Sequence, residues 1–271
     1  MIPDRARQLG EREAETPERP AATLLRVDIR GKSFASGNRG PILGDILLDI
    51  KAQEIIAVLG PSGSGKTTLL RMIAGLDADF NGQITGSDGV VGAPSARRGL
   101  VFQDARLLAW RTVRQNVAFG LPGSMKEVRS ARVDQMLELV GLSPAQHAWP
   151  RELSGGMEKR AALARALVGS PDLLMLDEPF GALDIQSRLG LQDELVSLHR
   201  QLGFSVLLVT HDIEEAVYLA DRIVILGGSP AGIRDEIAID LGHPRDRLSD
   251  PFSAARARVL ARVIDTDHHH R

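Results

Sequence analysis

Residues 55–67 read IIAVLGPSGSGKT, five apolar residues followed by a glycine-rich turn that ends in Lys66 and Thr67. The apolar run is typical of a strand buried on both faces of a parallel sheet. Glycines let successive backbone N–H groups point inward around phosphate oxygens, and a helix that begins at Lys66 favours an anion at its start. The turn fits the pattern G-x-x-x-x-G-K-[ST], in which the lysine reaches the β- and γ-phosphates and the hydroxyl ligates Mg2+. We therefore predict a phosphate site made of Gly60, Pro61, Ser62, Gly63, Ser64, Gly65, Lys66, Thr67 and Thr68.

Similar apolar runs recur further along the chain, at residues 173–176, 206–209 and 223–226. Between two of them, leucines at helical spacing from Ser187 to Leu202 end at Gly203, a plausible C-terminal cap. Strands that alternate with helices predict an α/β fold around a parallel sheet.

The segments around this core have different patterns. Residues 24–50 alternate in hydropathy around a turn-prone run at 36–41, which predicts a small antiparallel β lobe. From about residue 104 to 168 helical patterns dominate, so we expect a helical insertion. We predict a disordered tail at 1–22, a nucleotide-binding domain at 23–235 and a polar, Arg-rich extension at 236–271 with a weak helical pattern from Phe252 to Val263.

The bulk composition excludes several classes of protein. The 271 residues carry a formal net charge of −2 and contain no cysteine, so disulfides and thiolate metal sites are impossible and no basic excess favours nucleic acid. The longest apolar runs are far shorter than the roughly 20 residues of a membrane-spanning helix. The first 20 residues lack the apolar centre of a secretory signal peptide.

Two carboxylates, Asp177 and Glu178, follow the predicted strand at 173–176. Ligands bind at the carboxyl ends of strands in open α/β sheets. We expect Asp177 to hold Mg2+ and Glu178 to act as the base that polarises the attacking water. An ordinary acidic turn before Pro179 is the alternative.

A second anion-binding helix start is predicted at Leu153–Met157, where Ser154, Gly155 and Gly156 precede a helix-favouring segment. One nucleotide does not need two such sites on one subunit, whereas a head-to-tail dimer uses the second to cap its partner's γ-phosphate. A plain N-capped helix is the alternative.

Together, the phosphate loop, Gln103, the 153–157 segment, Asp177–Glu178, residues 182–184 and His211 resemble, in order and spacing, the ATPase subunits of ABC transporters over about residues 23–230. The resemblance implies a RecA-like P-loop core that binds ATP and Mg2+ and hydrolyses ATP. It implies that Gln103 reaches Mg2+ and couples the helical lobe to the core, that His211 faces the γ-phosphate, and that Asp184 senses the paired subunit. Phe34 resembles the residue that stacks on adenine. Taken alone, Gln103 also fits a surface residue, His211 a structural histidine and Phe34 a core residue.

Within that family, residues 106–113 (RLLAWRTV) are similar to importers of nitrate, sulfonate and taurine, and segments 149–152, 191–195 and 243–247 look most like aliphatic sulfonate importers. The resemblance implies a homodimer on the cytoplasmic face of the inner membrane, bound to two permease subunits and served indirectly by a periplasmic solute-binding protein. Apolar groups among Leu107, Leu108 and Trp110 suit docking of a permease helix, or alternatively pack the helical lobe. Met157, Gln53 and Ala109 depart from the usual Gln, Gly and Pro, and Gln53 is expected to strain its turn.

Two rival functions remain open at this level. A soluble ABC-type ATPase of DNA repair or translation would usually carry a coiled-coil insertion or a second cassette, and a small-molecule P-loop kinase would not need the 153–157 segment. Three adjacent histidines, 268–270, lie at the chain end without a defined coordination geometry.

Overall fold

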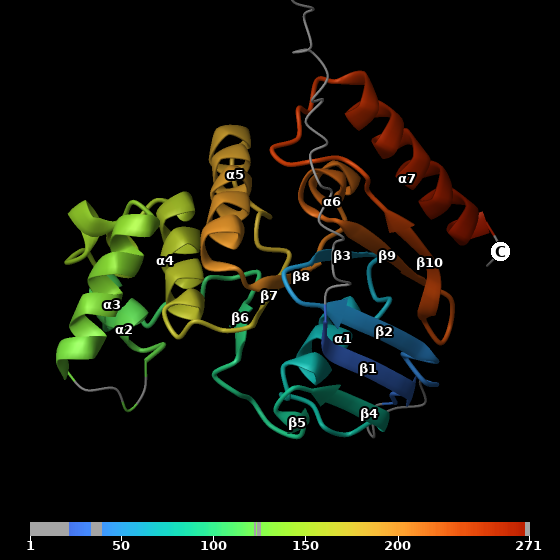
Figure 1. Ribbon diagram of the computed structural model, residues 1–271, viewed down its shortest axis with the longest axis horizontal. Helices are drawn as coiled ribbons and strands as arrows, with labels where there is room; N and C mark the ends of the chain where they lie inside the picture. Colours follow the sequence, from blue (N-terminus) through green and yellow to red (C-terminus); the bar gives the residue numbers. More distant parts are fainter. Residues whose placement is uncertain (1–21, 34–39, 122, 124–125, 269–271) are drawn as a thin grey trace, which may run out of the picture.

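The apolar run before the phosphate loop forms β3 (Ile55–Leu59), an inner strand of a sheet that has six strands in the described part of the chain. A computed structural model describes residues 22–33, 40–121, 123 and 126–268 (Figure 1). The strand order is β10-β9-β3-β8-β7-β6, and all neighbours pair in parallel except β10 with β9. The other strands are β6 (Arg98–Val101), β7 (Leu173–Asp177), β8 (Ser205–Val209), β9 (Arg222–Gly227) and β10 (Gly232–Ala238).

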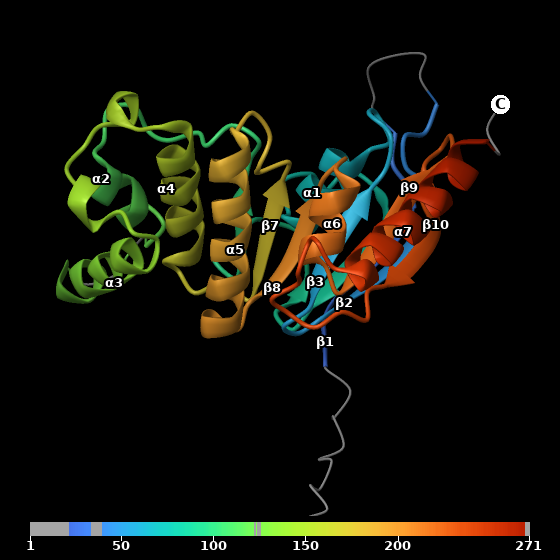
Figure 2. The ribbon, with the colours of Figure 1, turned by 90° about the horizontal axis from the view of Figure 1, so that it is seen from above.

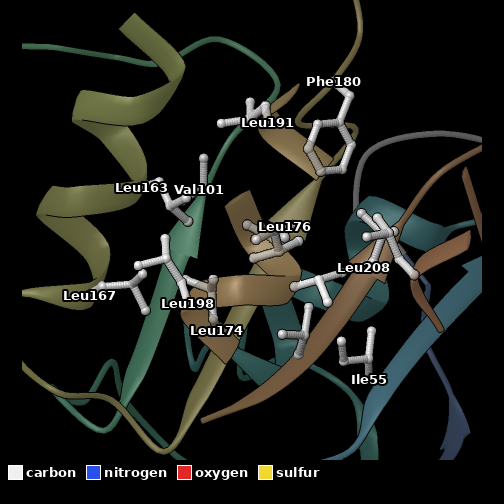
Figure 3. Close-up of a cluster of buried hydrophobic side chains, with 14 of the residues drawn as sticks. Ile55, Val101, Leu163, Leu167, Leu174, Leu176, Phe180, Leu191, Leu198 and Leu208 are labelled. Atoms are coloured by element: carbon white, nitrogen blue, oxygen red, sulfur yellow. The ribbon is translucent and has the colours of Figure 1, made fainter. Parts of the chain in front are cut away.

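Alternate residues of these strands enter two different hydrophobic cores, because side chains of a strand point to opposite faces with a period of two. Ile55, Ala57 and Leu59 join one buried cluster, whereas Ile56 and Val58 join the other. Both faces of the strand are therefore covered, as the unbroken apolar run predicts. Figure 3 shows part of the first cluster, where leucines of two helices meet the sheet: Leu163, Leu167, Leu191 and Leu198.

A second sheet, antiparallel and four-stranded within the described residues, has the order β2-β1-β4-β5. Its strands are β1 (Thr23–Gly31), β2 (Ile46–Lys51), β4 (Asn81–Gly86) and β5 (Gly89–Val90). Buried residues of β1, β2 and β4 pack in the cluster that also contains Ile56 and Val58. The predicted antiparallel lobe is confirmed, while Phe34 and residues 36–39 of the predicted loop lie outside the described residues.

The helices gather around the six-stranded sheet, and Figure 2 shows α2, α3 and α4 together at one end of the molecule. The helical segments before β7 are α1 (Lys66–Ile73), α2 (Val113–Ala118), α3 (Lys126–Leu139), two 3-10 turns (Ser143–Ala145 and Pro150–Glu152) and α4 (Gly155–Leu167). Those after it are α5 (Ile185–Leu202), α6 (Ile213–Leu219) and α7 (Asp250–His268). The α/β P-loop fold predicted from the sequence is confirmed, and the limits of the helical subdomain stay a prediction.

The C-terminal segment is joined to the main core. The predicted boundary at 235/236 falls inside β10, and α7 extends the weak pattern at 252–263 in both directions. Phe252 and Val259 of α7 are buried in the cluster that contains Ile55. The buried Arg245 donates to the carbonyls of Val217 and Ala220, at 2.7 Å each, so this segment also closes the end of α6.

Gln53 occupies the turn between β2 and β3 with a φ of 58°, the left-handed region that glycine accepts freely. Its backbone N–H donates to the hydroxyl of Ser205 at 2.9 Å, which ties the turn to β8. The strain expected from the sequence at this position is thus present in the backbone.

Candidate functional site

The phosphate loop connects the end of β3 to the start of α1 and is shaped by glycine. Gly63 and Gly65 both have a φ of 83°. A Cβ at Gly60 would lie 2.7 Å from the Leu226 carbonyl oxygen, and one at Gly65 would lie 2.5 Å from a methyl carbon of Leu43. Larger residues at these positions would displace the backbone, so the sequence pattern is dictated by close packing as well as by conformation.

Lys66 folds back over this loop, and its ammonium donates to the carbonyls of Gly60 and Pro61 at 2.8 and 2.9 Å. Burial lowers the pKa of Lys66, while the nearby charges of Glu178 and Asp177 oppose that shift. Lys66, Thr67 and Thr68 are the first three residues of α1, so the cation lies beside the helix start, where anions are favoured.

A hydroxyl and a carboxylate face each other across the sheet edge. Thr67 Oγ1 donates to Asp177 Oδ1 at 3.0 Å. Asp177 is the last residue of β7 and is buried. Burial raises its pKa, and the hydrogen bond from Thr67 opposes that shift. These are the hard oxygen ligands that Mg2+ prefers, so the residues present fit the metal expected from the sequence.

Glu178 and His211 are brought together by neighbouring strands. Asp177 pairs with Val209 in the β7–β8 register, so the residues that follow both strands meet at one edge. Glu178 has a φ of 43°, its backbone N–H donates to the Val209 carbonyl at 2.9 Å, and its carboxylate lies 3.4 Å from His211 Nδ1. The sequence predicted these residue types at strand ends, and the structure adds their contact.

Gln103 follows β6 and lies close to the same edge: a Cβ at Gly181 would be 3.8 Å from its side-chain amide nitrogen. Its backbone carbonyl accepts a hydrogen bond from Lys159 of α4. Arg165 of α4 donates to the next carbonyls, those of Ala105 and Arg106, at 2.8 and 2.7 Å. Neither cation was predicted from the sequence, although both lie on the helix for which Ser154 is the N-cap.

Ser154 is the N-cap of α4, and its side chain accepts from the backbone N–H of Met157 at 3.3 Å. Ser154 and Gly155 are exposed. A Cβ at Gly156 would be 3.6 Å from the Ser187 hydroxyl, so this helix start lies against α5. In Figures 1 and 2, α4 and α1 are separated with β7 between them, so the structure does not unite Ser154 with the phosphate loop of the same chain.

Other residues predicted from the sequence lie in the turn before α1 and at the start of α5. Pro61, Ser62 and Ser64 form the turn before α1, with the Ser64 N–H donating to the Pro61 carbonyl at 3.2 Å. Asp184 is the N-cap of α5 and accepts from the Ser187 N–H at 3.0 Å. Phe34 and the side chains of the histidine run at 268–270 lie outside the described residues.

A phosphate loop, an acidic strand end with a histidine partner, and a separate serine-capped helix define an ABC-type P-loop ATPase. The sequence matches the family profile described as "ABC transporter" over residues 43–181. The chain belongs to this family, and it is an ATP-binding and ATP-hydrolysing subunit.

Curated relatives are similar over almost the whole chain. The sequence is 43% identical over 244 residues to the aliphatic sulfonates import ATP-binding protein SsuB of Bacillus licheniformis, covering 90% of this chain and 95% of the relative. It is 42% identical over 271 residues to SsuB 1 of Streptomyces avermitilis, covering 98% of each.

A solved structure shares the fold. An ATP-binding cassette, solved as a dimer in a post-hydrolysis state bound to ADP and phosphate, superposes with a TM-score of 0.70 at 28% identity. The match covers 81% of this chain and all of that one. None of the helices in the described part of the present chain has the length and hydropathy needed to cross a bilayer.

Proposed function

We propose that this chain hydrolyses ATP to drive an importer of aliphatic sulfonates and works as a head-to-tail homodimer with Mg-ATP at its interface. The observation that carries the proposal is the meeting of Thr67, Asp177, Glu178 and His211 at one sheet edge, beside the phosphate loop. The sulfonate substrate rests on the relatives, which are sulfonate import proteins. Nitrate or taurine is the alternative within the same subgroup.

Around the phosphates of ATP, each side chain of the proposed site has a separate role. Lys66 exchanges its two loop carbonyls for β- and γ-phosphate oxygens when ATP binds. Thr67 and Asp177 would hold Mg2+ together with Gln103, and the ion would neutralise charge on the phosphates. Glu178 orients the attacking water and accepts its proton, and His211 holds the Glu178 carboxylate toward that water.

The second half of each site would come from the partner subunit. The Ser154 hydroxyl and the first N–H groups of α4 are suited to the γ-phosphate of ATP held by the other copy. Head-to-tail pairing of two identical chains forms two such sites at once. Asp184, at the start of α5, would then lie where the two subunits meet.

The surface beside the Gln103 loop would dock two permease subunits at the cytoplasmic face of the inner membrane, with a periplasmic binding protein acting indirectly. Trp110 and Phe119 are 71% and 58% exposed. A cavity of about 610 Å3 on this surface is lined by Arg111, Gln115, Ala118, Phe119, Gly123 and Arg129. Phe119 thus lines a hollow, and an exposed aromatic side chain beside a hollow suits a helix of a partner protein.

The test combines hydrolysis with uptake. In cells that make the chain together with its own permease and binding protein, we expect uptake of a labelled alkanesulfonate to exceed that of taurine or nitrate. Glu178→Gln should abolish the uptake and lower ATP turnover by about 10²-fold or more, because the base is lost. The exposed Glu214→Gln serves as a matched control and should leave both unchanged.

Different outcomes separate the alternatives. Uptake of taurine or nitrate in preference to the alkanesulfonate would reassign the substrate. Copurification with ribosomes or DNA in place of a permease would favour a soluble ABC-type ATPase. ATP turnover unaffected by Glu178→Gln would contradict the proposed chemistry.

A further inference from the structure

A buried carboxylate, Glu215, lies in the first turn of α6, directly after the loop that carries His211. It is 5% exposed. A buried carboxylate is unfavourable unless donors surround it. Two neutral donors do so: the Thr210 hydroxyl, and the Gln192 side-chain amide at 3.2 Å from Glu215 Oε1. Nothing in the proposed hydrolysis mechanism uses this residue.

The direction of these hydrogen bonds is fixed from the C-terminal segment. Arg247 donates to Gln192 Oε1 at 2.8 Å. Because a guanidinium only donates, the Gln192 oxygen faces Arg247 and its NH2 group faces Glu215. Arg247 is itself held over the ring of Tyr218, 3.2 Å from the centroid. Glu215 must therefore accept from Gln192.

The same reasoning applies to Thr210, which is 2% exposed. The backbone N–H of Asp212 donates to Thr210 Oγ1 at 3.0 Å, so the hydroxyl proton is free to be donated to Glu215. His211 lies between Thr210 and Asp212 in the chain. Its side chain is 68% exposed, and its Nδ1 lies 3.4 Å from the Glu178 carboxylate. The backbone on both sides of His211 is thus set by the bonds that Thr210 makes.

We infer that Glu215 is a positioning residue for ATP hydrolysis: it fixes the Thr210–Asp212 turn that holds His211 against Glu178, and Arg247 forms the outer end of the same hydrogen-bonded chain. The inference rests on the proposed function, since it assigns a role to the His211–Glu178 contact. It also gives the C-terminal segment an influence on turnover without any contact with the nucleotide.

The charges around Glu215 give a second readout. Thr210 and Asp212 face it from the loop before α6, and Gln192 and Arg188 face it from α5; on α7, Arg256 pairs with the neighbouring Glu214. Burial is the main cause that raises the pKa of Glu215 to about 7. The ionised form accepts from both donors, whereas a protonated or amide group keeps one acceptor oxygen, so its hydrogen bond with Thr210 has to reverse or is lost. Turnover should therefore rise as pH increases through about 7.

The experiment measures kcat and KM for ATP of the full-length chain across pH 6 to 9. We expect Glu215→Gln and Thr210→Val to lower kcat by about 5- to 20-fold with KM within about twofold, because misplacing His211 affects the reacting geometry more than ATP binding. Thr210→Ser keeps the hydroxyl and should restore kcat. Glu214→Gln, on the same helix and exposed, is the matched control and should behave like the wild type.

Several results would overturn the inference. They are wild-type kcat and an unchanged pH profile in Glu215→Gln, or a Thr210→Ser variant as slow as Thr210→Val. A loss confined to KM would also overturn it. If Glu215→Gln does not fold, the two Thr210 variants decide the question. Failure of the proposed function itself would appear separately, as wild-type protein without ATP turnover or as turnover that survives Glu178→Gln.

Discussion

Three non-glycine residues with a positive φ lie at or near the candidate site. Glu178 and Ala182 have φ angles of 43° and 60°, and Arg106, near Gln103, has 45°. Non-glycine residues in this region cost free energy and persist where the surroundings hold them. Gln53 has a similar φ but lies in the turn before β3, so a substitution there relieves the strain without changing the candidate site.

Gln53→Gly should stabilise the fold. Glycine accepts a φ of 58°, and the Gln53 side chain is exposed, so the substitution removes strain without loss of packing. The free energy of unfolding should increase by about 0.5–1 kcal/mol, measured by urea denaturation, because the relief of left-handed strain exceeds the extra backbone entropy that glycine loses on folding. Gln53→Ala keeps the strain and should show no gain; a gain as large as that of glycine would contradict the explanation.

Stability should depend on pH through two buried glutamates. Burial raises the pKa of both Glu194 and Glu215 to about 7 from the ordinary 4.5. Between these pH values the folded state binds more protons than the unfolded state, so the free energy of unfolding falls as pH rises from about 4.5 to 7. Denaturation at pH 5 and pH 8 should show this loss, and it should be smaller in Glu215→Gln. An equal loss in both proteins would argue against the assignment.

At the scale of elements, α4 links Ser154, its N-cap, to the rest of the molecule. Lys159 and Arg165 bind the carbonyls of the Gln103 loop, and Arg160 forms a 2.9 Å ion pair with Glu194 of α5. The start of α4 and the Gln103 loop are therefore mechanically connected within one subunit. This arrangement suits transmission of a nucleotide-dependent movement toward a docked partner.

Arg160→Ala should destabilise the junction between α4 and α5. It leaves the Glu194 carboxylate, with a side chain only 14% exposed, without its cation. We expect the free energy of unfolding at pH 8 to fall by about 1–3 kcal/mol. Arg97→Ala breaks a comparable but exposed ion pair with Asp172 and serves as the control, with no measurable effect expected. Equal effects of the two changes would contradict this interpretation.

The elements that the sequence predicted were those with a strong local pattern. Runs such as Ile55–Leu59 are apolar throughout, and Ser154 and Gly203 mark helix ends by residue type. The strands β4, β5, β6 and β10 were missed. β4 buries only Ile84, and β10 alternates irregularly around charged residues. These strands depend on the neighbours with which they pair, and no local signal identifies those partners.

The same limit applies to the site. The loop pattern predicted Lys66 and Thr67, and the position after a buried strand predicted Asp177 and Glu178. The contacts of Lys159 with the Gln103 loop, and of Arg247 with Gln192, join residues 56 and 55 positions apart. Such contacts follow from the packing of α4 and of the C-terminal segment, which the sequence pattern left undetermined.

At the scale of the whole molecule, the proposed ATP site divides into two parts on one chain. The phosphate loop and its carboxylates lie at one sheet edge, whereas Ser154 lies at the start of α4. The structurally similar ATP-binding cassette was solved as a dimer. Our account therefore requires a second copy to complete each ATP site, and ATP turnover should increase with protein concentration.

The most direct test is the association state of Glu178→Gln, measured by size-exclusion chromatography with light scattering in Mg-ATP. The account predicts a stable dimer with ATP, because binding persists while hydrolysis is blocked, and a monomer without nucleotide. Adding Ser154→Arg to the same chain should abolish the dimer while each monomer still binds ATP. A Glu178→Gln protein that stays monomeric in saturating Mg-ATP, or a dimer unaffected by Ser154→Arg, would contradict the shared site.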